Sequence, residues 1–215
     1  MLEHKTVSLA EQVFERLETE ILSGKYQQGE VLTEMKLVAD LGVSRTPIRE
    51  ALRRLEQEHI IEITGKGIVV LGVTHKDLKD IFDIRLRIEG MASYAAAKRI
   101  TEEELKELRE TLELQEFYVP RKDADRIKVY DSKFHQLVYQ FSGSAVYYDA
   151  LIPLHKKVQK YRKASVENQD RAELSAREHR AIFEAIEKGD AELAEKYTIQ
   201  HIQNAKDHIL NRGEE

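Results

Sequence analysis

The chain has 215 residues, 41% hydrophobic and 34% charged, so it is long enough for two small domains that each have their own core. It has no cysteine, which excludes a disulfide framework and a thiolate metal site and fits a reducing cytoplasm. No stretch approaches the roughly 20 apolar residues of a membrane span, no apolar signal segment opens the chain, and the formal net charge is −5, so we expect an acidic cytoplasmic protein without a membrane partner.

The first 41 residues predict two helices. Apolar residues recur at helical spacing from Leu9 to Leu22, and Gly24 then ends this first helix. A shorter second helix is expected from Thr33 to Leu41. The side chains expected to face inward are Leu9, Val13, Phe14, Leu17, Ile21, Leu22, Leu37, Val38 and Leu41.

The stretch from Leu41 to Leu52 predicts a tight turn followed by a third helix. Gly42 can adopt the left-handed conformation that ends one helix, and Ser44 can cap the next by accepting a hydrogen bond from a backbone N–H. Pro47 falls in the first turn, where its missing N–H is harmless. The spacing turns Ile48, Ala51, Leu52 and Leu55 inward, turns Thr46, Arg49 and Arg53 outward, and leaves Arg45 at the border. A helix with arginines and small hydroxyls near its N-terminus is typical of one that enters a DNA major groove.

A β-hairpin follows the third helix. The β-branched runs Ile60–Ile63 and Ile68–Val70 flank the turn Thr64-Gly65-Lys66-Gly67, which predicts a wing with Lys66 at its tip. Leu71 to Thr74 then forms a short joint, and we place the first domain at residues 1–72.

Residues 7 to 71 resemble the winged helix-turn-helix of the GntR family of bacterial transcription regulators. The resemblance rests on Ile21-Leu22-Ser23-Gly24, Gly29-Glu30-Val31-Leu32, the stretch from Leu41 to Leu52, and the Lys66-Gly67 wing. Where some members have an arginine, this chain has Met35 with Lys36 beside it. The resemblance implies that operator DNA contacts Ser44, Arg45, Thr46, Arg49 and Lys66, with the two arginines nearest guanine edges and Lys66 near the minor groove or a phosphate; we add the cations Lys36 and Arg53.

The charge distribution agrees with a specific DNA reader. Residues 1–72 contain 9 Lys and Arg against 12 Asp and Glu, a balance of −3. From Lys36 to Arg54 the sign reverses, because 5 cations face 2 acids and the balance is +3. A focused basic patch on an acidic body suits an operator binder better than a general DNA coat.

Beyond Thr74 the pattern is purely helical, so the fold class is mainly α, with a winged helix-turn-helix followed by an all-helical antiparallel bundle at residues 75–213. Thr101 before three glutamates, Gly143 and Gly189 supply stop and start signals. The expected helices cover 75–98, 102–117, 124–142, 145–165, 171–188 and 190–211.

Three histidines and an aspartate share the apolar faces of these helices. Asp131 and His135 lie one turn apart, and His179 and His201 lie on later helices. Their apolar neighbours on the same faces are Ile127, Phe134, Val138, Phe141, Ile182, Phe183, Ile186, Ala194, Tyr197 and Ala205. A single core histidine is common, but four such polar groups are costly to bury together unless something binds them, which favours a metal site.

Residues 75 to 211 resemble the FCD effector domain of the FadR-like branch of the same family. Its metal-binding members carry Asp-x-x-x-His on one helix and single histidines on the last two, matched here by Asp131 to His135, by His179 and by His201. The resemblance implies one divalent metal per chain held by these four residues, and their nitrogen and oxygen donors fit Zn²⁺ or Ni²⁺. Members that sense fatty acyl groups lack the histidines, so the expected effector is a small carboxylate.

Arg85 is the expected partner of that carboxylate. It lies on the predicted apolar stripe of its helix, where a buried cation needs an anion. An intramolecular ion pair between Arg85 and Glu89, one helical turn further on, is an equal alternative to the effector carboxylate. His155 and His208 can also reach the same cavity, although ordinary core or surface positions suit them better.

These patterns predict a ligand-responsive repressor that binds a palindromic operator as a homodimer, since one recognition helix reads only a few base pairs. Two alternatives stay open. A metal-dependent hydrolase with Glu178 as general base leaves the winged helix unexplained. The stronger rival is a constitutive DNA-binding factor with a purely structural metal.

Overall fold

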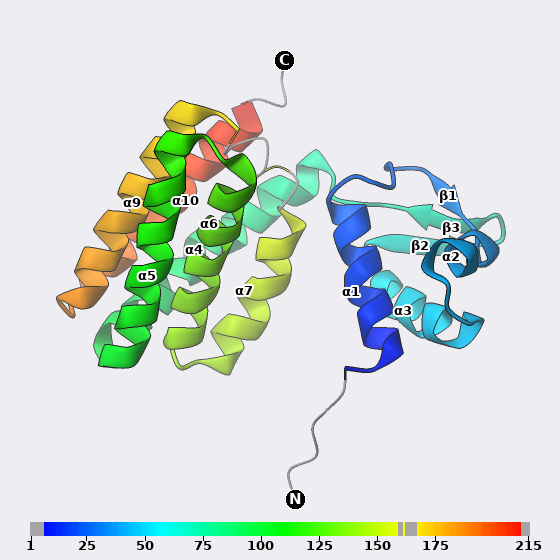
Figure 1. The fold of residues 1–215 in the computed structure, drawn as a ribbon, viewed down its shortest axis with the longest axis horizontal. Coiled ribbons are helices and arrows are strands. Elements are labelled where there is room, and N and C mark those ends of the chain that lie inside the picture. Colours follow the sequence, from blue (N-terminus) through cyan, green and yellow to red (C-terminus); the bar gives the residue numbers. More distant parts are fainter. Residues whose placement is uncertain (1–6, 159–160, 162–166, 212–215) are drawn as a thin grey trace, which may run out of the picture. The chain divides into compact units, whose positions relative to one another are not determined.

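The structure is a computed structural model that describes residues 7–158, 161 and 167–211. The chain divides after Thr74 into two compact units, and each is described by itself (Figure 1). The helix expected over 145–165 ends at Lys157, and positions 159–160 and 162–166 of that range lie outside the described residues.

The first unit contains three helices and a small sheet. In chain order its elements are α1 (Leu9–Leu22), β1 (Val31–Leu32), α2 (Glu34–Leu41), α3 (Arg45–Gln57), β2 (Ile61–Thr64) and β3 (Gly67–Val70). The strands are antiparallel in the order β1-β3-β2. Ile61 pairs with Val70 and Thr64 with Gly67, so the expected wing forms around a two-residue turn that holds Lys66.

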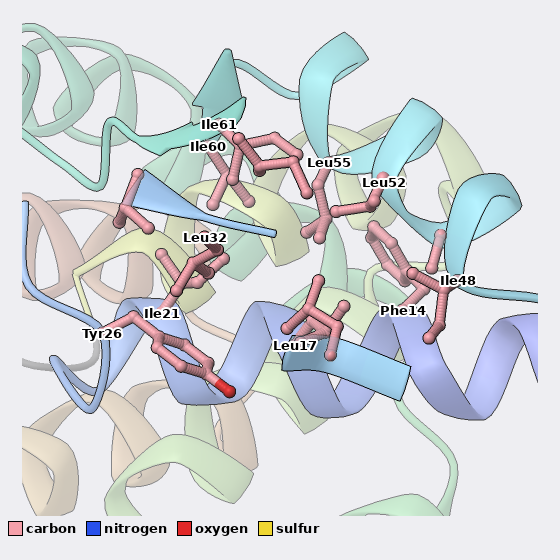
Figure 2. Close-up of a cluster of buried hydrophobic side chains, with 14 of the residues drawn as sticks. Phe14, Leu17, Ile21, Tyr26, Leu32, Ile48, Leu52, Leu55, Ile60 and Ile61 are labelled. Carbon is pink, nitrogen blue, oxygen red and sulfur yellow. The ribbon is translucent and has the colours of Figure 1, made fainter. Parts of the chain in front are cut away.

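The core of this unit is built from the apolar stripes of α1 and α3 and from the sheet. Figure 2 shows Phe14 and Leu17 of α1 facing Leu52 and Leu55 of α3, with Ile60 and Ile61 beside them. The inward residues predicted for α3 are all buried, whereas Arg45, Arg49 and Arg53 are exposed. The packing therefore fixes which face of α3 is free to read DNA.

The turn between α2 and α3 follows the prediction in its backbone but not in its cap. Gly42 ends α2 at a φ of 67°, in the left-handed region that glycine tolerates. Ser44 occupies the N-cap position of α3, but its side chain makes no capping hydrogen bond. The expectation of a Ser44 cap bond was wrong. Thr33 does cap α2, because its hydroxyl accepts from the backbone N–H of Lys36.

Strand β1 was not predicted, because two residues are too few to show a pattern of alternation. It lies against β3, with Val31 opposite Val69 and Leu32 opposite Ile68. A Cβ on Gly67 would lie 2.8 Å from the carbonyl oxygen of Leu32. Glycine at position 67 therefore allows this close approach of backbones, besides its place in the wing turn.

The second unit is an antiparallel helical bundle. Its elements are α4 (His75–Arg99), α5 (Glu102–Tyr118), the short 3-10 helix η1 (Val119–Arg121), α6 (Ala124–Phe141), α7 (Ala145–Lys157), α9 (Gln169–Glu187) and α10 (Ala191–Asn211). Thr101 and Glu104 form a reciprocal capping box at the start of α5, as the sequence predicts. Short connections between the long helices make chain neighbours run in opposite directions (Figure 1).

The bundle core has an apolar layer and a polar layer. Phe134, Val138, Phe183 and Ile186 belong to a large buried apolar cluster that also draws on α4, α5 and α10. Beside this cluster the same helices bury His135, His179, His201 and Asp131, each at most 3% exposed. Tyr197, expected on the inward face of the last helix, is instead 36% exposed at the edge of that face. Among the described residues, no helix is long and apolar enough to cross a membrane.

Candidate metal centre and DNA-reading surface

Three buried histidines converge on one point in the bundle. His135 comes from α6, His179 from α9 and His201 from α10. The Nε2 atom of His179 lies 3.2 Å from that of His135 and 3.3 Å from that of His201, and the remaining pair of Nε2 atoms is 3.3 Å apart. The described residues thus contain a group of three side chains able to hold a metal ion.

The outer nitrogens of these rings face hydrogen-bond acceptors. His179 Nδ1 is 2.8 Å from Gln115 Oε1, and His201 Nδ1 is 2.6 Å from Glu178 Oε2. His135 Nδ1 faces the carboxylate of Glu89 at 3.4 Å. An amide or carboxylate oxygen accepts hydrogen bonds, so this geometry favours a proton on Nδ1 of His179 and of His201 and leaves each Nε2 able to offer a lone pair to an ion.

Three inward lone pairs fit a divalent cation. Nitrogens about 2.1 Å from an ion are separated by about 3.4 Å at tetrahedral angles and about 3.0 Å at octahedral ones. The observed separations of 3.2 and 3.3 Å fall between these values. Neutral lone pairs cannot donate hydrogen bonds to one another, so the polar layer has an unmet need for positive charge. The donor set therefore fits the expected metal.

Asp131 lies beside this group but is not one of its three members. Its Oδ1 atom is 3.8 Å from Nε2 of His179 and accepts a hydrogen bond of 3.3 Å from the hydroxyl of Ser175. Position and chemistry suit a fourth ligand that would move toward a bound ion. Asp131 as a ligand thus stays a prediction.

Glu178 is held in place by three partners. Besides His201, its carboxylate accepts hydrogen bonds from Arg171 at 2.9 Å and from Asn204 at 2.6 Å. Burial alone would raise the pKa of Glu178, but the hydrogen bond from His201 and these neighbours outweigh it and lower the pKa to about 2. The carboxylate is therefore ionised and accepts the hydrogen bond that orients His201.

Arg85 forms a buried ion pair with Glu89, the alternative partner that the sequence offers. The side chains are 2% and 0% exposed. Burial alone would raise the pKa of Glu89, but the adjacent Arg85 guanidinium lowers it. Since the other oxygen of Glu89 faces His135, one carboxylate links Arg85 to the histidine group. An anion that binds Arg85 would thus be linked to His135 through a single carboxylate, that of Glu89.

His155 also belongs to this polar layer. It is 3% exposed, and its ring centroid lies 5.3 Å from that of His135. Its Nδ1 atom lies 3.5 Å from the hydroxyl of Tyr139. Neither His155 nor the half-buried His208 belongs to the group of three converging rings.

Sequence reasoning missed Gln115 as the partner of His179. Gln115 is fully buried, and it follows Leu108 and Leu112 on the inward stripe of α5. A polar residue at an apolar position of a helix was the available signal. Among the described residues, its Nε2 atom is buried without a hydrogen-bond partner, so the amide is positioned chiefly by the histidine.

The residues predicted to read DNA lie on exposed parts of the first unit. Ser44, Arg45, Thr46, Arg49 and Arg53 are exposed on α3, and Lys66 is exposed at the wing turn. Arg49 donates from Nε to both oxygens of Glu34 on α2, at 2.9 and 3.0 Å.

The cations and apolar groups of α2 complete this surface. Lys36 pairs with Glu30 at 3.1 Å, while Met35 is 70% exposed. This pair and the Arg49–Glu34 pair are both solvent-exposed, and exposed ion pairs are weak, so both cations can exchange their acid for a phosphate or a base.

A winged helix-turn-helix joined to a helical domain defines a DNA-binding transcription regulator, and comparison with known proteins gives its family. The model "Bacterial regulatory proteins, gntR family" matches residues 9–70, and the model "FCD domain" matches residues 80–204. The chain therefore belongs to the GntR family, in its FCD-containing branch, and is a regulator, not an enzyme.

Individual relatives agree with this family. The chain is 31% identical over 210 residues to the HTH-type transcriptional regulator YdhC of Bacillus subtilis, covering 95% of this chain and 93% of the relative. It is 37% identical over 122 residues to the gluconate operon transcriptional repressor of Bacillus licheniformis, covering 57% and 50%. Among solved structures it is similar to E. coli McbR/YncC, with a TM-score of 0.82 and 25% identity over 98% of this chain and 100% of the other.

Proposed function

We propose that this regulator is a repressor that binds a palindromic operator as a homodimer and releases it when a small carboxylate binds at a metal centre in its FCD domain. The metal is a single Zn²⁺ or Ni²⁺ ion held by Asp131, His135, His179 and His201. The observation that carries the proposal is the convergence of three Nε2 atoms within 3.3 Å, each on a ring whose outer nitrogen faces an acceptor.

The DNA-reading part of the proposal uses the exposed face of α3. Arg45 and Arg49 lie near the start of this helix, where the side chains of a recognition helix reach base edges, and Arg53 lies two turns further on. Lys66 at the wing supplies a contact to the sugar-phosphate backbone of the DNA, and such a contact carries no sequence information. Two copies of this surface, related by a two-fold axis, give the discrimination that one helix lacks.

The sensing part uses the charges around the histidines. A bound divalent ion, with three or four protein donors, offers open positions that favour an anionic oxygen. Arg85 supplies a second cationic point for the same acid, and Glu89 is the anion that holds Arg85 in the acid's absence. Support also comes from a relative named for a gluconate operon, since gluconate is a hydroxy acid.

The competing proposal is a structural metal in a constitutive DNA-binding protein. It is favoured by the same buried ion pair, because Arg85 already has a partner in Glu89. The two proposals differ in one respect: only the sensor predicts that a small acid changes DNA affinity.

An operator titration with metal-loaded protein distinguishes them. We expect one acid among hydroxy-, keto- and dicarboxylic acids to weaken operator binding by a coupling on the order of 1–3 kcal/mol. Arg85→Ala should lower acid affinity while metal content and acid-free DNA binding stay near normal. If no acid shifts the wild-type titration, the structural metal is the better account; if an acid shifts both proteins equally, Arg85 serves only to pair with Glu89.

A further inference from the structure

Helix α4 carries a second apolar stripe that faces solvent. Its inward face is buried in the bundle by residues such as Leu78, Phe82 and Ala92. On its solvent-facing side Ile84 is 43% exposed and Met91 is 45% exposed, with half-buried Ile88 and Ala95 between and beyond them. The stripe is therefore Ile84, Ile88, Met91 and Ala95.

The spacing of this stripe is that of a helix-pairing seam. Its members are separated by four, three and four residues, so they lie in one narrow line along α4. Among the described residues, helices α7 and α10 flank α4 and leave Ile84 and Met91 on the line exposed. Ile88 packs against the cluster that includes Leu151 of α7, and Ile199 of α10 lies 2.9 Å from where a Cβ on Gly90 would stand. A helix that is apolar on two sides needs a partner for the second one.

The charges at the two ends of the stripe are opposite. Exposed Asp77 and Asp80 lie on the same line near the start of α4, and exposed Lys98 lies on it near the end. When two copies of α4 pack antiparallel about a two-fold axis near Ile88, Ile84 of one copy faces Met91 of the other, and Asp77 faces Lys98. Apolar residues then meet apolar ones and the acid Asp77 meets the cation Lys98, which a parallel pairing does not achieve.

We propose that this stripe of α4 is the interface through which a second copy of the chain docks, antiparallel and two-fold symmetric. The occupant is a second copy because the stripe is complementary to itself in both polarity and charge. The inference rests on the homodimer of the proposed function and names its surface. It also connects dimer and sensor, because the buried face of the same helix carries Arg85 and Glu89.

Sedimentation of the full-length, metal-loaded chain tests the surface. Met91→Glu places two unpaired carboxylates in the interface, and we expect dimerisation to weaken on the order of a hundredfold or more. Leu114→Glu is the matched control, because Leu114 is 40% exposed on α5, away from the stripe. Both variants should keep wild-type helicity and metal content. A dimeric Met91→Glu protein, or a monomeric Leu114→Glu protein, would overturn the assignment.

Disulfide trapping tests the antiparallel register, and the absence of native cysteine removes any background. The double variant Ile84→Cys with Met91→Cys should form an intermolecular disulfide on oxidation. Each single variant should not, because in this register a cysteine and its own copy lie about 10 Å apart along the axis. Rapid trapping of either single variant would overturn the antiparallel arrangement. A wild-type chain that is monomeric would contradict the homodimer itself, whereas a wild-type dimer that survives Met91→Glu contradicts only this surface.

Discussion

The two units place their functional polar groups in opposite environments. The cations that α3 and the wing turn toward solvent, Arg45, Arg49, Arg53 and Lys66, are exposed, and Arg49 pairs with the surface acid Glu34, so their presence costs the fold little. The three histidines of the bundle are at most 3% exposed and face one another through bare nitrogens, an arrangement that is costly without a cation. Burial therefore makes the candidate metal centre recognisable from its geometry. The candidate DNA-binding surface is recognisable chiefly from the turn between α2 and α3 and from the family to which the chain belongs.

The largest effect should follow from removing the central residue of the proposed metal site. His179→Ala deletes the ring whose Nε2 atom approaches both other histidines, so we expect stoichiometric metal binding to be lost. The melting temperature should fall as well, since bound metal at a hundred times its Kd stabilises a fold by about 2.7 kcal/mol. Elemental analysis and thermal unfolding measure both. His155→Gln is the matched control and should keep full loading; metal-replete His179→Ala protein would show that the ligand set is different.

The exposed region should respond to mutation without any loss of stability. Arg49→Ala should lose roughly 1–3 kcal/mol of operator affinity per half-site and relax base preference, because a bidentate contact to guanine is removed. Lys66→Ala should instead weaken operator and scrambled duplex evenly. Arg16→Ala, which removes a half-exposed cation from α1, serves as the control. Unaltered operator affinity in Arg49→Ala would rule out this arginine as a base reader.

These contrasting environments also explain what the sequence allowed us to predict. Spacing and capping signals were sufficient for the helices of both units except the end of the one expected over 145–165, for the wing turn, and for the inward placement of His135, His179 and His201. Strand β1 was not predicted, because a strand of two residues forms by pairing with β3 and shows no sequence pattern of its own. The missing side-chain cap of Ser44 is a matter of rotamer, which backbone preference does not determine.

Contacts between distant parts of the chain were harder still. Gln115 and His179 are 64 residues apart, and their hydrogen bond depends on how α5 packs against α9. For the same reason the sequence did not decide whether Arg85 pairs with Glu89 or with an effector carboxylate. The position of Glu89 one helical turn away explains only the intramolecular pair.

An intermediate effect should come from the residue that orients His201. Glu178→Gln keeps an oxygen near Nδ1 but removes the charge, so we expect metal affinity to fall by about 10–100-fold. Competition with a chelator of known affinity measures this change. Glu173→Gln is the matched control, because Glu173 is an exposed acid on the same helix. Equal metal affinity in the two variants would mean that Glu178 has no influence on the centre.

The smallest effect should come from releasing a DNA-facing cation. Glu34→Gln frees Arg49 and removes a negative charge from the reading surface, so affinity for every duplex should rise by a few-fold at most. Titrations at two salt concentrations measure it, with Glu15→Gln on α1 as the control. A large loss of operator affinity would mean that Glu34 positions Arg49 for reading rather than merely shielding it.

The central claim is that one small acid links the buried centre to the exposed reading surface, and reciprocal binding tests it most directly. Calorimetry would measure acid affinity for the metal-loaded protein alone and with saturating operator. By thermodynamic linkage we predict that operator weakens acid binding by the same factor by which acid weakens operator binding, about 5- to 150-fold. Acid affinity that is identical with and without operator would contradict the claim, even in a protein whose metal and DNA sites are both as described.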